Sequence, residues 1–483
     1  MRFPRFSQVV VAMLGFAVVV PAGHLTEHAV FLFSRSVPQE REQESTPLEL
    51  LHAGSMEVRT ITPRAGEPYR VTDAADSVLF RHGDQYILAD NATYLDLQEQ
   101  IVLSGRVHGW DLDWTFWADE VIYRGQERII TTRGNVRSLN LRDSTRVDAD
   151  QIRFDRNSGD GLANGFPRLF QPPKDSTANA TIVEGSETSR LFFHKDAGWA
   201  EIDRGAVVRR GDITISGSWL RSEDNPQRLI VRNQVELIKE GIHASGGQLV
   251  WDESNGLARL TGDNPRLNRW ASREEGSLDS VRTSMVADSL DLLIEEDVLQ
   301  SIHMHGQGEV TTVTIPEPGS VRIRPDSTEV PAEPDHMRLI GRDIDISLEG
   351  ERLDVLTAQR GAMYYWREDL PERTSALGGM ELVITFISGE PENVEARQNA
   401  VTRYFTDLEA GDSDMVRMLA SLIRFTLEDG AFKRANLENG NAVMYSADIV
   451  RSGVVSMAVH PDSVRVGAVR GGGGGSSSVP PAG

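Results

Sequence analysis

The feature that most constrains the fold is a repeated unit of two short alternating strands, a turn and a glycine or asparagine corner. In one copy, Ala118-Asp119 precedes the apolar residues Val121 and Tyr123, and a second strand leads to Gly134-Asn135. Residues at i and i+2 of a strand share one face. The corner glycine or asparagine recurs about every 30 residues, which is typical of stacked antiparallel strands.

The apolar residues at alternating positions are expected to line a continuous interior. They are Ala92, Tyr94, Val121, Tyr123, Ile152, Phe154, Leu290, Leu292, Ile344, Ile346, Leu348, Leu382, Ile384, Phe386, Ile423 and Phe425. The residues between them are polar and are expected to face water: Glu120, Arg153, Asp291, Asp345, Ser347, Thr385 and Arg424. One apolar face in every unit favours an all-β sheet that is curved around an apolar interior. The best helical candidate, 394–408, carries the Asn-Ala-Val corner signature and is also interpreted as strand.

The Ala-Asp-x-apolar-x-Tyr/Phe strand followed by a Gly-Asn-Val corner resembles the OstA-like family of lipopolysaccharide-transport bridge proteins. This family includes LptA, LptC and the N-terminal domain of LptD. The best match covers about residues 76–170, and fainter copies extend to about residue 445. The resemblance implies a twisted β-jellyroll, an open V of stacked antiparallel strands. The chain is longer than one family domain, lacks a second half that could form the translocon barrel, and has irregular repeat spacing after Gly262.

The resemblance also implies a function without catalysis. The predicted protein binds the lipid A acyl chains of lipopolysaccharide in the groove, with the alternating apolar residues as its lining, and passes them toward the outer membrane. Its expected partners are other lipopolysaccharide-transport jellyroll proteins, joined by pairing of edge strands. No catalytic residue, cofactor or nucleic-acid partner is expected.

Composition along the chain, together with the family resemblance, predicts six segments. Residues 1–22 form a signal peptide or an N-terminal anchor, because two arginines precede an uncharged run of 18 residues, 6–23. Residues 23–66 are a linker, 67–314 an OstA-like jellyroll, 315–337 a Pro/Glu-rich loop, 338–470 a second jellyroll segment, and 471–483 a flexible Gly/Ser tail. The predicted location is the periplasm, with a possible inner-membrane anchor.

Charge and cysteine content exclude several classes of protein. The formal net charge of −22 argues against a nucleic-acid binder, which needs a basic surface. The absence of cysteine excludes disulfides, thiol nucleophiles and Cys-type zinc sites. His303 and His305 could ligate a metal from one strand, but no third ligand is near them in sequence, so no metal site is assigned.

Three alternatives stay open from the sequence. The alternating residues suit the core of a closed β-sandwich equally well. A parallel β-helix acting on polysaccharides also stacks short strands and uses acidic residues in a groove. An envelope or surface scaffold could use the same repeat without a lipid. The aromatic segment 111–117 could grip a lipid or sugar, although packing between strands is the simpler explanation.

Overall fold

The structure is a computed structural model that describes residues 49–445. Within this range it leaves out positions 64–66, 83, 113, 125, 143, 156, 159, 174–178, 195–198, 225, 253, 273–279, 296–297, 324–328, 350–351, 369–370, 388–389, 406–414 and 429–430. The predicted signal or anchor at 1–22 and the predicted tail at 471–483 lie outside the described residues. The predicted linker is described from residue 49 and contains two strands, β1 (Glu49–His52) and β2 (Ser55–Ile61).

The chain divides into two compact units, 1–269 with 288–300, and 270–287 with 301–483. The further strands of unit 1 are β3 (Tyr69–His82), β4 (Gln85–Leu95), β5 (Gln100–Trp110), β6 (Trp114–Arg124), β7 (Ile129–Asn140), β8 (Arg146–Asp155), β9 (Asp160–Asn164), β10 (Arg168–Gln171), β11 (Thr181–Gly185), β12 (Arg190–His194), β13 (Trp199–Arg210), β14 (Ile213–Asp224), β15 (Gln227–Lys239), β16 (Ile242–Asp252), β17 (Leu257–Thr261) and β20 (Ser289–Glu295). Strands β18 (Arg266–Ser272) and β21 (Val298–Ile315) each include a unit boundary.

Unit 2 also consists mainly of strands. Its strands are β19 (Ser280–Val286), β22 (Val321–Ile323), β23 (Glu329–Pro331), β24 (Asp335–Glu349), β25 (Arg352–Arg367), β26 (Ser375–Gly378), β27 (Glu381–Ile387), β28 (Glu390–Phe405), β29 (Met415–Glu428), β30 (Ala431–Glu438) and β31 (Asn441–Tyr445). Among the described residues the only helical turns are two short 3-10 segments, η1 (Asp96–Gln98) and η2 (Pro371–Arg373). No helix in this part of the chain has the length and apolar character needed to cross a membrane.

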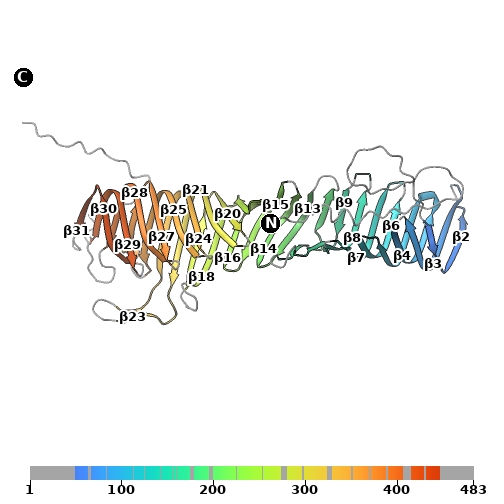
Figure 1. The fold of residues 1–483 in the computed structure, drawn as a ribbon, viewed down its shortest axis with the longest axis horizontal. Coiled ribbons are helices and arrows are strands. Elements are labelled where there is room, and N and C mark those ends of the chain that lie inside the picture. The colour runs from blue at the N-terminus through green and yellow to red at the C-terminus, as the bar shows by residue number, and fades with distance from the viewer. Residues whose placement is uncertain are drawn as a thin grey trace, which may run out of the picture. The chain divides into compact units, whose positions relative to one another are not determined.

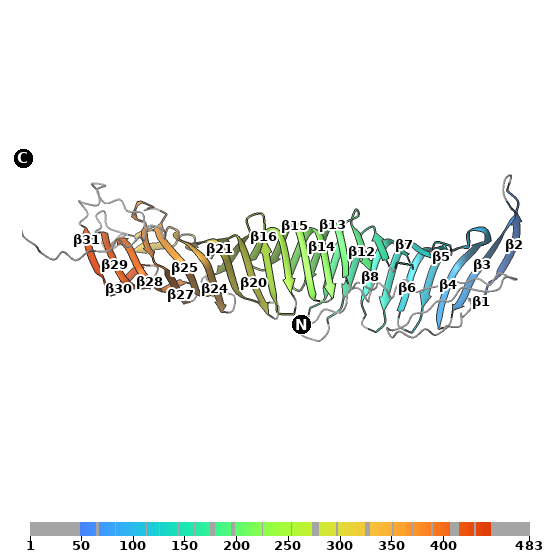
Figure 2. The same ribbon diagram turned by 90° about the horizontal axis from the view of Figure 1, so that it is seen from above.

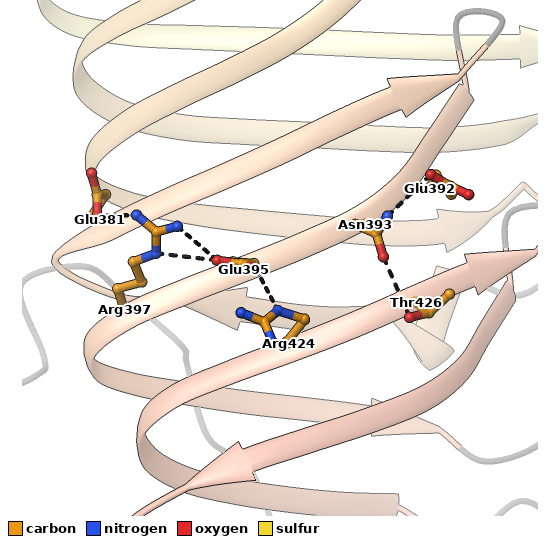
Figure 3. A network of polar contacts seen from close by, with 7 residues as sticks. All are labelled: Glu381, Glu392, Asn393, Glu395, Arg397, Arg424 and Thr426. Carbon is orange, nitrogen blue, oxygen red and sulfur yellow. Dashed lines mark hydrogen bonds and ion pairs between the residues drawn. The ribbon is translucent and has the colours of Figure 1, made fainter.

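Each long strand bends once and contributes to two different rows of paired strands. The first part of β8 pairs with β10, and its second part pairs with β9. In unit 2, β29 pairs in the same way with β31 and β30. We call one of these rows arm A; it contains β10 in unit 1 and β31 in unit 2. The other row, arm B, contains β9 in unit 1 and β30 in unit 2. Figures 1 and 2 show neighbouring strands side by side within each unit, and Figure 3 shows the ribbons of unit 2 curving back at their bends into a second layer.

The bends keep one face of both arms turned inward. In β8 the buried residues are Val147 and Ala149 in arm A, then Ile152 and Phe154 in arm B. A spacing of three residues between Ala149 and Ile152 would place them on opposite faces of a straight strand, because strand side chains alternate with a period of two. The bend at Asp150 reverses this phase, so that apolar side chains line the inside of both arms.

The bend explains why the repeat carries aspartate followed later by glycine. Gly134 has a φ of +72°, and a methyl group added to it would lie 2.2 Å from Oδ2 of Asp119 and 2.8 Å from its Cβ. Asn135 also has a positive φ, and its Nδ2 donates to Oδ2 of Asp119 at 2.9 Å. The same arrangement places Asp90 against Gly105. Only glycine fits this left-handed position against the neighbouring aspartate.

These observations confirm the all-β prediction and the strand interpretation of 394–408, most of which belongs to β28. The jellyroll itself stays a prediction. The pairings among the described residues are antiparallel, so the parallel β-helix alternative is wrong as a description of this fold. The predicted Pro/Glu-rich loop holds the β22–β23 hairpin and the start of β24.

Candidate lipid-binding interior

The residues predicted to line a groove are placed on the inside of the fold. Tyr94 is half-buried, and all the others are buried, with exposed fractions of 8% or less. Burial, together with the nearby charges of Asp96 and Glu99, raises the pKa of Tyr94 to about 12. The phenol therefore stays neutral at physiological pH. Sequence alternation thus identified inward-facing positions in both units.

All of these predicted residues lie in arm B, and the repeat pattern alone did not identify the matching inner face of arm A. Buried apolar residues of arm A include Ile87, Phe116, Val136, Val147, Leu169, Val208, Ile215 and Leu267 in unit 1, and Met285, Val310, Leu339, Met363, Leu377 and Met418 in unit 2. The signal was present in the sequence, because apolar residues also alternate before Ala-Asp and after the glycine corner. Reading both halves of each bent strand would have found them.

Where β8, β9 and β12 meet, the interior is filled by the chain's own side chains. Phe154 and Phe193 are stacked with ring centroids 6.2 Å apart, and both are buried. A methyl group on Gly161 would lie 1.6 Å from the Phe193 ring, so this ring lies directly over the glycine. An acyl chain could enter such an interior only if the two arms moved apart.

Hydrogen bonds at the turns connect neighbouring hairpins within one arm. In arm B, Nε2 of Gln126 donates to the carbonyl of Leu97 at 3.4 Å, and Nδ2 of Asn157 donates to the carbonyl of Glu127 at 3.1 Å. These bonds add to the backbone pairing along the row. Each arm is therefore held together as a sheet, and the bends are where the same strands pass from one arm to the other.

The outer faces carry ionic networks. On β27, β28 and β29, Arg397 reaches Glu381 at 3.2 Å and Glu395 at 2.8 Å, and Nε of Arg424 donates to the other oxygen of Glu395 (Figure 3). Burial alone would raise the pKa of Glu395, but the hydrogen bonds from Arg424 and Arg397 together lower it. The water-facing side of arm B is thus charged, opposite to its apolar inner side.

One predicted water-facing residue is an exception. Asp291 is only 8% exposed. Arg259 covers it through two hydrogen bonds of 2.6 Å, one to each carboxylate oxygen. The position lies on the outer face as predicted, but the long arginine side chain shields it from water, which alternation alone does not reveal.

The aromatic segment 111–117 is divided between the two faces. Trp114 and Phe116 are buried, whereas Trp117 is 38% exposed and stacks on His108 with centroids 5.0 Å apart. His108 also lies 4.8 Å from the ring of Trp110. Burial lowers the pKa of His108. Packing between strands therefore accounts for most of this segment, and Trp117 belongs to an outer aromatic row.

No family model and no curated protein matches the chain. Among solved structures, the chain is similar to LptH of Pseudomonas aeruginosa, described as the LptA-homologous periplasmic component of the conserved lipopolysaccharide transport device. The identity is 14%, the match covers 37% of this chain and 82% of that one, and the TM-score is 0.13. At this score the likeness carries no argument about the function of the chain.

Proposed function

We propose that the chain is a non-enzymatic periplasmic protein that binds lipopolysaccharide by its acyl chains and passes them along the interior between arms A and B. The observation that carries this proposal is the apolar lining of both arms, repeated from strand to strand within each unit. Strands are spaced about 4.8 Å apart, so the six strands from β3 to β8 alone extend the lining over about 24 Å.

Acyl chains need such a lining to cross an aqueous compartment. Each methylene group removed from water is worth about 0.8 kcal/mol. Neighbouring strands offer similar apolar surfaces, so a chain that slides from one strand to the next loses little of this free energy. The charged headgroup would stay in water beside the polar outer faces.

Terminal strands supply a means of joining partners of the same kind. In unit 1, Met56 and Val58 of β2 are 62% and 57% exposed. In unit 2, Met444 of β31 is 67% exposed. Strands with exposed apolar side chains are suited to pairing with a strand of another protein. We expect other lipopolysaccharide-transport proteins to be added there, so that one lined interior continues into the next.

Site-specific photo-crosslinking in cells tests the proposal. Ile152 is 1% exposed on the inner face, and its neighbour Arg153 is exposed on the outer face, so the two form a matched pair in one strand. A photo-crosslinking residue at position 152 should capture lipopolysaccharide, whereas the same residue at position 153 should not. Equal capture at both positions, or capture at neither, would count against an interior lipid site.

A scaffold protein of the cell envelope is the second candidate. Its supporting observation is the close packing of the interior, where the buried lining is 8% exposed or less. A scaffold would keep its arms together and take no lipid. Removal of the protein from cells should then leave outer-leaflet lipopolysaccharide unchanged, whereas loss of a transporter should deplete it.

A further inference from the structure

The bend between β21 and β24 brings together a group of side chains that sequence spacing does not connect. One nitrogen from each of His303 and His305 and one carboxylate oxygen of Asp343 all lie within 4.8 Å of one another. Both histidines are half-buried, and Asp343 is exposed. All three residues belong to unit 2.

Strand pairing produces this arrangement. His303 pairs with Asp345 across β21 and β24, and the register shifts between Met304 and Gln307. His305 lies within that shift, and the next residue, Gly306, donates its amide to Oδ1 of Asp343 at 3.2 Å. The bend therefore turns both imidazoles toward Asp343, while Met304 between them is fully buried inside.

Aspartates at other bends of the chain have other partners. Asp90 binds the Arg106 guanidinium at 2.7 Å, and Asp119 accepts from the Asn135 amide. At the β21–β24 bend, the strand opposite the aspartate instead presents two imidazoles. Imidazole and carboxylate together form the donor set of many zinc sites.

We propose that His303, His305 and Asp343 bind a divalent cation of the Zn²⁺ type. Calcium and magnesium prefer all-oxygen sites, so two imidazoles select for zinc and similar transition metals. Tetrahedral zinc with bonds of about 2.0–2.1 Å places its ligand atoms about 3.4 Å apart. The distances between the three ligand atoms, which are at most 4.8 Å, therefore need to shorten by about 1.4 Å at most. Small side-chain rotations at a half-exposed site provide this movement.

Asp345 completes the site as a positioning residue. Its carboxylate contacts Nδ1 of His303. A carboxylate on one imidazole nitrogen fixes the ring orientation and raises the basicity of the nitrogen that binds the metal. With water in the fourth position, the cation would fasten β21 to β24 and stabilise this bend of unit 2.

Titration of the untagged, chelator-treated full chain with Zn²⁺ tests the site by calorimetry, with Co²⁺ absorption as a second probe. We expect one saturable site per chain, lost or weakened at least tenfold in His305→Gln and in Asp343→Asn. Asp345→Asn should weaken binding by about 10–100-fold and shift the Co²⁺ spectrum, and Asp345→Glu should restore part of both. His243→Gln, in β16 of unit 1, is the matched control and should bind as the wild type does.

Two results would overturn the site. One is an absence of saturable binding to the wild-type chain, and the other is unchanged binding in both ligand variants. Circular dichroism checks that each variant is folded, and Asp343→Asn changes an exposed side chain if His305→Gln fails this check. A Zn²⁺-dependent rise in unfolding temperature for the wild type, absent in the ligand variants, would give independent support.

Discussion

Replacement of Gly134 by alanine tests the role of the aspartate–glycine bend in holding the two arms. Gly134 has a φ of +72°, and an alanine in left-handed backbone costs about 1–2 kcal/mol. Its methyl group would also lie 2.2 Å from Oδ2 and 2.8 Å from Cβ of Asp119. Rotation of the carboxylate relieves only the first contact and removes the hydrogen bond from Asn135. The collision adds about 1–3 kcal/mol, which gives about 2–5 kcal/mol in total.

Gly205 provides the matched control for this substitution. It has a φ of +99°, but a methyl group added there meets nothing within 4 Å. Gly205→Ala should therefore carry only the backbone cost of about 1–2 kcal/mol. The contrast between the two variants isolates the contact with Asp119 from the conformation of the backbone.

Hydrogen exchange measured by mass spectrometry is the suitable assay, because a long repeat array does not unfold in one step. Peptides from β6 and β7 should exchange faster in Gly134→Ala, and peptides from β13 should change less in Gly205→Ala. In the double variant with Asp119→Gly and Gly134→Ala, the two substitutions should be coupled, so that at least about 1 kcal/mol of the stability lost in Gly134→Ala is recovered. Equal effects of the two glycine substitutions, or no coupling with Asp119, would refute this reasoning.

Two further predictions concern pH. Because the folded-state pKa of Glu395 is lowered, its stabilising contribution is present above the unfolded-state pKa of about 4.3 and is lost as pH falls through the folded value. Glu395→Gln should therefore lower the free energy of unfolding by about 1 kcal/mol at neutral pH and by much less in acid. Unfolding measured across pH checks this, and a difference that does not depend on pH would contradict it. Burial lowers the pKa of His108, so protonation of this ring should destabilise its stack with Trp117 as pH falls below about 6.5. The same loss of stability should be absent in His108→Gln. Tryptophan fluorescence checks the second prediction.

Local sequence chemistry was enough to predict the strands and their inward positions. Ile152 and Phe154, or Ile344 and Ile346, alternate with polar residues, and this period is a property of the strand itself. The bend was also predictable, because a left-handed position favours glycine, and asparagine after it. The alternation read in arm B did not extend to arm A, because the phase of burial changes at the bend between Ala149 and Ile152, so each half of a bent strand has to be read separately.

Contacts between segments that are far apart in the sequence could not be predicted from it. Asp343 lies 38 positions after His305, and only the pairing of β21 with β24 brings it to the two histidines. Asp291 is covered by Arg259 for the same reason, since β17 and β20 pair across an intervening segment. Strand register at long range decides both, and the spacing of residues along the chain does not encode it directly.

We expect arms A and B to move apart when acyl chains enter, and the distance between their turns tests this most directly. The chain has no cysteine, so Glu127→Cys in the turn before β7 and Leu141→Cys in the turn after it give unique spin-label sites on the two arms. Pulsed electron spin resonance should show the distance between the labels increasing by about 4 Å, one hydrocarbon layer, when lipopolysaccharide is added. A distance distribution that stays unchanged while lipopolysaccharide is bound would contradict the account.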